Sequence, residues 1–294
     1  MERIRPYYLS FDDIEKLSKR ELGHGTDGAV YRLGNGELIK IYHTRFKDIK
    51  KQLVLDDSDV KIYTPSTVMR NKFNEPINYF RYEDNEDIRL RSKDAIFEAI
   101  KRQDSITRSN LPKNVVYLNG AFAGCVLTET KGVQIHKLGF LPMKYKKAII
   151  EEILISIEEL MANYIYHVDL SNSPYAKRLF VNNDGVTESL GHSHILVNPF
   201  TLKPNIIDLD GKSTVYMEHE SEKYKEQCLY NLCILMIEFL FGIDTDEYKE
   251  EDDFDKYLAI ALEQSGVKDE FIDDLSKYSL SLEDSFRLIK SLGK

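Results

Sequence analysis

The chain has 294 residues, of which 42% are hydrophobic and 30% are charged, and this balance excludes a disordered or fibrous protein. Its formal net charge of −9 argues against a nucleic acid as the main partner. The longest apolar run, "LCILMIEFLFG", has about half the length that a membrane span needs, so it predicts a buried core helix and no membrane span.

Cysteine usage and the N-terminal residues both bear on the compartment. The opening "MERIRPYYLSFDD" has neither the apolar core nor the small-residue cleavage site of a secretory signal. Cys125, Cys228 and Cys233 form no C-x-x-C pair, and an odd number of cysteines without a signal favours reduced thiols. We therefore expect a cytoplasmic protein whose cysteines are buried and inert.

The first part of the chain predicts a short helix, a β-hairpin and then a stretch without a clear pattern. "SFDDIEKLSKR", residues 10–20, begins with Ser-x-x-Asp and has apolar residues at helical spacing. Residues 29–43 contain two runs of β formers joined by Asn35 and Gly36, a strong hairpin signal. Residues 44–90 are polar and interrupted by prolines, and no element is predicted there with defined bounds.

A second helix and a second hairpin follow. "SKDAIFEAIKRQ", residues 92–103, predicts a helix that Ser92 caps, with its apolar residues on one face. "NVVYLNGAFAGCVLTET", residues 114–130, predicts a hairpin with an Asn-Gly turn.

The character of the sequence changes after about residue 130. Residues 146–167 predict one long amphipathic helix, residues 193–211 predict strand, turn and strand, and the remainder is helical. Strands in the first half and helices in the second predict an α+β chain with two lobes. The boundary is placed near residue 131, which gives an N-terminal lobe of 1–131 and a C-terminal lobe of 132–294.

"GHGTDGAV", from Gly23 to Val30, has the spacing G-x-G-x-x-G-x-V. A dinucleotide fingerprint requires a helix after the glycines, and a Walker loop ends in Gly-Lys-Ser/Thr, so the hairpin that follows here excludes both. The pattern indicates a glycine-rich hairpin over phosphates, with Gly23, Gly25 and Gly28 allowing close backbone approach. Such a lid needs a cation in the next strand, and Lys40 is the candidate. The alternative for Lys40 is an ordinary solvent-facing lysine.

Two acidic motifs lie in the second half of the chain. In "YHVDLS", Asp169 is a candidate to accept a proton from a hydroxyl group, and His167 could brace its loop. In "NIIDLDG", Asp208 and Asp210 follow an apolar strand and precede Gly211, a pattern that suits Mg²⁺ because hard cations prefer carboxylate oxygens. A structural role remains the alternative for both motifs, as a braced loop or an Asx-capped turn.

Taken in this order, the glycine loop, the strand lysine, the His-x-Asp motif and the Asp-Leu-Asp-Gly motif resemble the protein-kinase-like superfamily over about residues 18–245. The resemblance implies a bilobal fold with a β-rich N-lobe that carries one main helix, and a helical C-lobe. It also implies ATP and Mg²⁺ as cofactors. Lys40 then pairs with phosphates and with Glu98 on the predicted helix, while Asp169 is the base and Asp208 binds the metal.

The resemblance also assigns a hinge and a second metal ligand. "LTETKG" looks like the hinge, with Thr128 at the gatekeeper position and the backbone of residues 129–131 available to adenine. Residues 172–193 look like an insertion before "HILV", which places His194 where the family has a metal-binding asparagine, with Asn172 as the rival. The residues thus assigned to the nucleotide are Gly23, Gly25, Gly28, Val30, Lys40, Glu129 and Lys131, and those assigned to the metal are Asp208, His194 and Asn172.

Several positions depart from the family pattern. Val168 replaces the arginine of His-Arg-Asp, Pro174 stands five residues after Asp169, and Cys228 replaces the aspartate that begins the family's helix F. The segment between Gly211 and that helix is short, so the peptide-docking activation segment is absent or reduced.

The resemblance implies an ATP-dependent phosphotransferase that acts on a protein Ser/Thr or Tyr hydroxyl. Two alternatives stay open. A small-molecule kinase of the aminoglycoside or choline type is favoured by the short activation segment and by the acidic C-terminal region, which could attract a cationic substrate. A pseudokinase that binds nucleotide without transfer is favoured by Pro174, Leu209 and Cys228.

Overall fold

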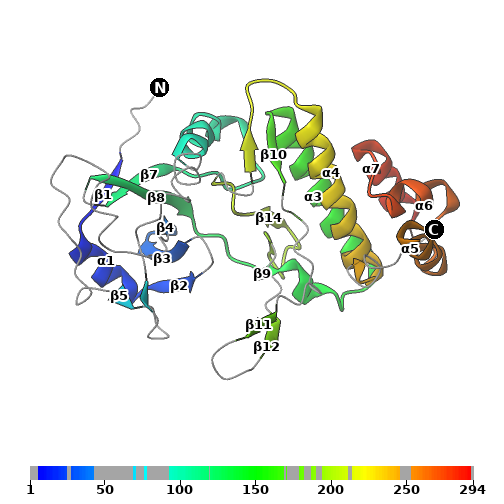
Figure 1. Ribbon diagram of the computed structural model, residues 1–294, viewed down its shortest axis with the longest axis horizontal. Coiled ribbons are helices and arrows are strands. Elements are labelled where there is room, and N and C mark those ends of the chain that lie inside the picture. The colour runs from blue at the N-terminus through cyan, green and yellow to red at the C-terminus, as the bar shows by residue number, and fades with distance from the viewer. Residues whose placement is uncertain are drawn as a thin grey trace. The chain divides into compact units, whose positions relative to one another are not determined.

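The protein is described by a computed structural model. Its described residues are 6–24, 28–42, 69–70, 76–77, 93–118, 120–168, 170, 179–181, 187–189, 194–210, 214–245 and 253–292. They belong to two compact units (Figure 1). Unit 1 comprises Met1–Ser105, Asn110–Glu129 and Leu209–Lys212, and unit 2 comprises Ile106–Ser109, Thr130–Asp208 and Ser213–Lys294. The segment Leu209–Lys212 belongs to unit 1 although the residues on both sides of it in the chain belong to unit 2. No local sequence pattern predicted this.

Unit 1 is built on a six-stranded sheet. Its strands are β1 (Tyr7–Leu9), β2 (Glu21–His24), β3 (Gly28–Gly34), β4 (Glu37–Tyr42), β7 (Asn114–Leu118) and β8 (Ala121–Thr128), in the order β1-β7-β8-β4-β3-β2. All neighbours are antiparallel except β1 and β7. Both predicted hairpins are confirmed, and Asn35 and Gly36 have the positive φ angles of 55° and 74° that a tight turn requires.

The sheet of unit 1 has an apolar layer on each face, which follows from alternation along its strands. Ile39 and Ile41 of β4 are fully buried in one cluster with Leu17 of α1 (Phe11–Ser18), whose N-terminus has the predicted capping box. The other face is covered by residues 93–101, which are helical as predicted and bury Ile96. Tyr42 lies on that second face, so the two faces of β4 differ in polarity.

Shorter elements complete unit 1. The two-residue strands β5 (Met69–Arg70) and β6 (Pro76–Ile77) pair with each other, and η3 (Gln103–Ser105) is one turn of 3₁₀-helix.

In unit 2 the predicted long helix is shorter than the sequence indicated. Helix α3 (Met143–Ala162) ends five residues before His167, and the predicted helical end is instead strand β10 (Ile165–His167), paired with β15 (Thr214–Tyr216). The break lies at Tyr164, whose φ of 57° is left-handed. The prediction failed because "YIYH" continues the apolar pattern of the helix. A short apolar run that is buried on both faces suits a strand equally well, so the pattern alone does not distinguish the two.

The strand, turn and strand predicted over residues 193–211 are confirmed in unit 2. Strands β13 (Ile195–Val197) and β14 (Pro204–Ile206) pair antiparallel, and β9 (Val133–Gln134) joins β13 as a third strand. Strands β11 (Leu179–Val181) and β12 (Thr187–Ser189) pair within the segment that looked like an insertion.

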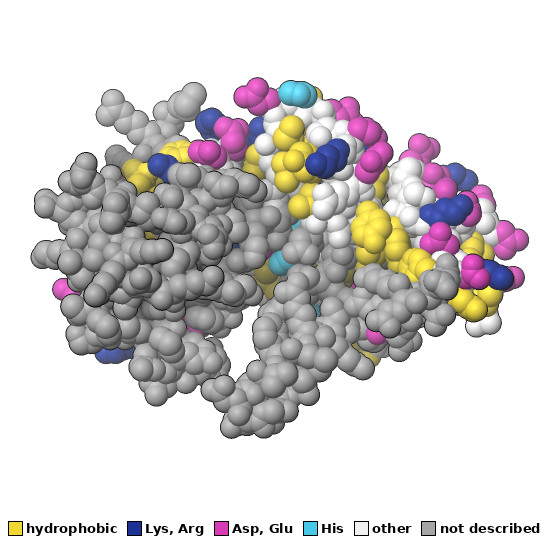
Figure 2. All heavy atoms as spheres, viewed as in Figure 1, with side chains coloured by type: hydrophobic (Ala, Val, Ile, Leu, Met, Phe, Trp, Pro, Cys, Tyr) yellow, Lys and Arg dark blue, Asp and Glu magenta, His cyan; other side chains and the backbone are white. Residues whose placement is uncertain are grey.

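The rest of unit 2 is helical. Helix α4 (Glu222–Met236) continues as the π-helical turn η5 (Ile237–Phe241), and Gly242 ends it with φ of 72°. The remaining elements are η4 (Ile135–Leu138), α5 (Phe254–Gln264), α6 (Asp269–Ser276) and α7 (Leu282–Ser291). The predicted core run lies in α4 and η5 and is almost wholly buried. On the face seen in Figure 2, charged side chains of both signs are spread over helices of unit 2, as solvated helix faces should be.

The described residues thus form an α+β protein with a sheet-based N-terminal part and a helical C-terminal part. Within these residues, no helix combines the length and the apolar character that crossing a membrane requires.

Candidate functional site

Lys40 occupies the centre of the unit 1 sheet and does not face solvent. Its side chain is 12% exposed, and its Nζ lies 2.7 Å from Oδ2 of Asp210, whose side chain is 2% exposed. The expected partner, Glu98, instead pairs with Lys101 and Arg102 on its own helix. Those residues are three and four positions further on, where side chains of a helix meet. The assignment of Glu98 as the partner of Lys40 is therefore corrected to Asp210.

Tyr42 gives Asp210 a second contact on the same face of β4. The Tyr42 hydroxyl donates a hydrogen bond of 2.9 Å to Asp210 Oδ2 and lies 3.9 Å from Cys125 Sγ. Burial, and then the negative charge of Asp210, raise the pKa of Tyr42 well above its ordinary value. The phenol therefore stays protonated and remains a donor to the carboxylate.

The register of the sheet aligns Lys40 with part of the glycine loop. Directly opposed residues of antiparallel strands point to the same face. One such row runs Gly23, Val30, Lys40, Cys125 and Val115 across β2, β3, β4, β8 and β7. A Cβ added at Gly23 would meet no atom of the described residues within 4 Å, so packing among them does not require glycine there.

Gly124 brings β8 unusually close to β4. A Cβ built at Gly124 would lie 1.8 Å from the backbone oxygen of Lys40, a separation that no side chain could accept. The absence of a side chain at this position thus allows the strand that carries Lys40 to pair with β8.

Glu129, the first residue of the predicted hinge, makes hydrogen bonds within unit 1. The backbone N–H of Glu129 donates to the Gly36 carbonyl at 2.7 Å, and its carboxylate accepts from Arg32 Nε at 2.9 Å. Lys131 is exposed in an irregular stretch of unit 2. The Glu129 N–H is therefore already satisfied and is not available to adenine, while the other backbone groups of residues 129–131 stay a prediction.

The candidate metal ligands of unit 2 come together. Nε2 of His194 lies 3.5 Å from Oδ2 of Asp208, and the two side chains are 15% and 21% exposed. The Ile207 N–H donates to the His194 carbonyl at 2.8 Å, which connects the ends of β13 and β14. Adjacent ligands of a six-coordinate Mg²⁺ lie about 3 Å apart, since each bond is about 2.1 Å long. The observed separation is close to that value.

Asp208 has an unusual backbone that is held in place. Its φ is 67°, in the left-handed region that glycine adopts freely and that, among other residues, asparagine and aspartate adopt most often. Its carbonyl accepts a hydrogen bond of 3.2 Å from Thr214 Oγ1 of β15. Among the described residues no group of three or more His, Cys, Asp or Glu side chains converges as a metal site, so any metal here would need further oxygen ligands.

His167 is a buried, neutral residue next to His194 and Ile207. It is fully buried, its Nε2 lies 3.1 Å from the Ile207 carbonyl, and its ring centre is 5.3 Å from that of His194. Because a carbonyl only accepts, Nε2 carries the hydrogen. Burial and the nearby His194 ring lower the pKa of His167 to about 3. His167 thus orients neighbouring backbone and does not exchange protons near neutral pH.

Asn231 is a functional candidate that the sequence reasoning missed. Its Nδ2 donates to the Val168 carbonyl at 3.0 Å and to the Gln227 carbonyl at 2.7 Å, and the residue is 8% exposed. Val168 directly precedes Asp169, so α4 holds the backbone next to the predicted base. Cys228, one turn earlier, is buried, and burial raises the pKa of its thiol to about 12. An asparagine inside the apolar "YNLCILM" was the available signal.

Three predicted site residues, Gly25, Asp169 and Asn172, lie outside the described residues. Of the others, Gly23 and Gly28 lie in β2 and β3, and Gly28 is the register partner of Tyr42.

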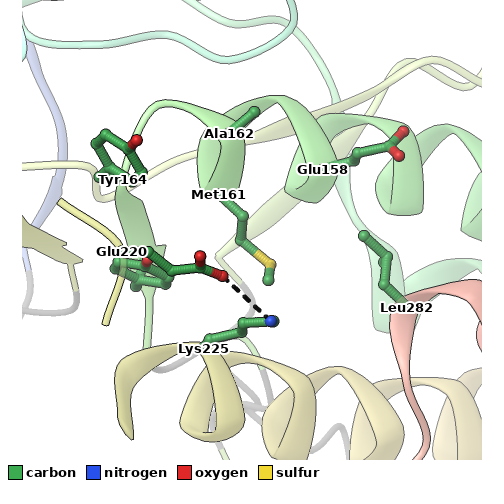
Figure 3. Close-up of a pocket in the computed structure, with 8 residues that line it drawn as sticks. Glu158, Met161, Ala162, Tyr164, Glu220, Lys225 and Leu282 are labelled. Carbon is green, nitrogen blue, oxygen red and sulfur yellow. Dashed lines mark hydrogen bonds and ion pairs between the residues drawn. The ribbon is translucent and has the colours of Figure 1, made fainter. Parts of the chain in front are cut away.

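A further pocket of about 270 Å³ lies in unit 2 (Figure 3). Met161, Ala162 and Leu282 give it apolar walls, and the ion pair between Glu220 and Lys225 lines one side. None of the predicted site residues lines it.

The resemblance to the protein-kinase-like superfamily is supported by the sequence motifs alone. No protein-family model matches the chain, and no curated protein matches it at a significant level.

Proposed function

We propose that the chain is an ATP- and Mg²⁺-dependent phosphotransferase that moves the γ-phosphoryl group of ATP to a protein hydroxyl. The observation that carries the proposal is the placement of Lys40. A strand lysine that is only 12% exposed and lies in register with Val30 and Gly23 of the glycine loop suits a phosphate-binding role better than a solvent-facing one.

The residues present fit the groups that the proposal requires. The ammonium group of Lys40 would bind phosphate oxygens, and the backbone at Gly23 leaves room for close approach. Asp208 supplies the carboxylate oxygen that Mg²⁺ prefers, and His194 supplies a softer imidazole nitrogen beside it. Bound Mg²⁺ would neutralise phosphate charge.

The transfer itself needs few covalent roles from the protein. The acceptor oxygen forms a bond to the γ-phosphorus while the bond from that phosphorus to the oxygen of the β-phosphate breaks, which releases ADP. The proton of the hydroxyl passes to Asp169, which we assign as the base from the sequence motif. Lys40 stabilises charge on the phosphates, and Asn231 holds the backbone beside Asp169 through the Val168 carbonyl.

Transfer from γ-labelled ATP tests the proposal directly. The wild-type protein with Mg²⁺ should label itself or a protein in a lysate, and Asp169→Ala and Asp208→Ala should abolish labelling. Label that appears only on an added amine or sugar alcohol would assign the small-molecule class instead. Binding of ATP without any transfer would assign a pseudokinase.

Gly23→Ala provides a test that does not depend on transfer. The added Cβ meets no atom of the described residues within 4 Å, so thermal stability without ligand should be unchanged. If phosphates lie over Gly23, ATP should stabilise the variant less than the wild type, for which a ligand at 100 times its Kd adds about 2.7 kcal/mol. Gly139→Ala in unit 2, whose added Cβ makes one ordinary contact of 3.5 Å, is the matched control. Equal stabilisation of all three proteins would contradict the assignment of Gly23.

A further inference from the structure

We propose that the two aspartates of Asp208-Leu209-Asp210 have different tasks: Asp210, hydrogen-bonded by Tyr42, positions Lys40, while Asp208 is left to the metal. Asp210 thus takes the place that the sequence predicted for Glu98. The proposal rests on the proposed function, because a positioned lysine matters only if Lys40 binds phosphates.

One carboxylate oxygen of Asp210 contacts both Lys40 and Tyr42. Asp210 Oδ2 accepts from Lys40 Nζ at 2.7 Å and from the Tyr42 hydroxyl at 2.9 Å. Lys40 and Tyr42 are two residues apart on β4 and therefore point to the same face. The oxygen is held at two points by one rigid strand. It fixes one direction of the Lys40 ammonium group, which has three hydrogens to donate in all.

Asp210 and its partners are more deeply buried than Glu98. Asp210 is 2% exposed and Tyr42 is 5% exposed, so water screens the attraction between Asp210 and Lys40 only weakly. Glu98 is 34% exposed, and its two cationic partners lie on its own helix. Its charge is thus already compensated at a more solvated position.

Each of the two aspartates is bound within its own unit. Asp210 contacts Lys40 and Tyr42 of unit 1, whereas Asp208 contacts His194 and Thr214 of unit 2. Only Leu209, which is 1% exposed, separates them in the chain. Asp208 and Asp210, two positions apart in the chain, therefore contact different polar groups.

Steady-state kinetics with protein substrate and varied ATP and Mg²⁺ separate the two tasks. Asp210→Asn should lower kcat by about tenfold or more with the Mg²⁺ requirement unchanged, because positioning is lost and the metal site is intact. Tyr42→Phe, which keeps both the ring and the ion pair, should lower kcat by about threefold in the same way. Asp208→Asn should instead raise the Mg²⁺ concentration for half-maximal rate by about tenfold or more.

Glu98→Gln tests the alternative partner, and Asp104→Asn, an exposed aspartate of unit 1, is the control for loss of one negative charge. We expect both to stay within about twofold of the wild-type kcat. A fall in kcat for Glu98→Gln that equals that of Asp210→Asn would overturn the proposal. A rise in the Mg²⁺ requirement for Asp210→Asn would also overturn it, because Asp210 would then be a metal ligand.

A second measurement needs neither ATP nor transfer. An amine-acylating reagent should modify Lys40 faster in Asp210→Asn than in the wild type, as read by mass spectrometry of the peptide that contains Lys40, and Glu98→Gln should not change the rate. Failure of the proposed function would leave the wild type without ATP binding or transfer but with this difference intact. Equal acylation of Lys40 in all proteins would refute the positioning role itself.

Discussion

Two polar clusters, one in each unit, accommodate their charges in opposite ways. In unit 1, Lys40 and Asp210 form an ion pair that is almost wholly withdrawn from water. In unit 2, His167 is buried in its neutral form and Asp208 keeps partial contact with solvent. Removing one member of a buried ion pair leaves the other charge uncompensated. Removing a neutral buried ring leaves only its hydrogen-bond partner unsatisfied. The first cluster should therefore be sensitive to substitution and the second to pH.

The largest effect is expected when the ion pair of unit 1 is broken. Lys40→Met leaves the Asp210 carboxylate buried without the cation at 2.7 Å, and should lower the free energy of unfolding by about 3–5 kcal/mol. His194→Gln, which removes the ring nitrogen 3.5 Å from Asp208, should cost less than about 1 kcal/mol because both groups are partly exposed. Chemical denaturation measures both. Losses of equal size would contradict the comparison.

A pair of glycine substitutions sharpens the comparison between the two units. Gly124→Ala puts a Cβ 1.8 Å from the Lys40 carbonyl oxygen, and β4 and β8 must separate to accept it. Gly132→Ala in unit 2 puts a Cβ 2.9 Å from the Val197 backbone oxygen, a smaller overlap that still requires backbone to shift. We expect losses of about 3 kcal/mol and about 1 kcal/mol respectively in thermal unfolding. A larger loss of stability for Gly132→Ala than for Gly124→Ala would contradict this expectation, because the tighter backbone contact would then be the one in unit 2.

Acid should weaken the cluster of unit 2. The pKa of His167 falls from its ordinary 6.5 to about 3 on folding, so between these values the unfolded chain binds more protons than the folded one. The stability from keeping His167 neutral is complete above pH 6.5 and declines as the pH falls toward 3. From pH 7 to pH 5 the loss should be about 2 kcal/mol.

Unfolding of the wild type and of His167→Gln, compared at both pH values, isolates this term. The groups that contribute to the shift in His167 are His194, Asp208 and the Ile207 carbonyl, and all three remain in the variant. A glutamine cannot gain the charge of imidazolium, so the variant should lose less stability in acid. Parallel losses in both proteins would remove His167 from the explanation.

The smallest effect is expected at Asn231. Asn231→Ala leaves the Val168 carbonyl without its donor in a buried setting, and should cost about 1–2 kcal/mol. Asn163→Ala, which removes a similar bond to the Glu159 carbonyl at the end of α3, is the matched control and should cost about 0.5 kcal/mol. If the proposed function holds, Asn231→Ala should also lower kcat, and Asn163→Ala should not.

Local patterns predicted most of the elements because the required signals are short. The Asn35-Gly36 turn, the Ser10 capping box and the alternation around Lys40 each involve residues within a few positions of one another. The end of α3 was misplaced because an apolar run of four residues suits helix and strand equally well. The partner of Lys40 was misassigned because Asp210 lies far along the chain, and no local spacing distinguishes it from Glu98.

The sequence by itself determined the α+β class, the hairpins, the position of Lys40 in a strand and the presence of acidic motifs late in the chain. These features depend on backbone preferences and on periodicity, which neighbouring residues set. Only the tertiary structure decided which carboxylate meets Lys40, that His194 lies beside Asp208, and that Asn231 holds the Val168 carbonyl. Such pairings depend on how sheets and helices pack over long separations, where burial and charge select among several residues of the same type.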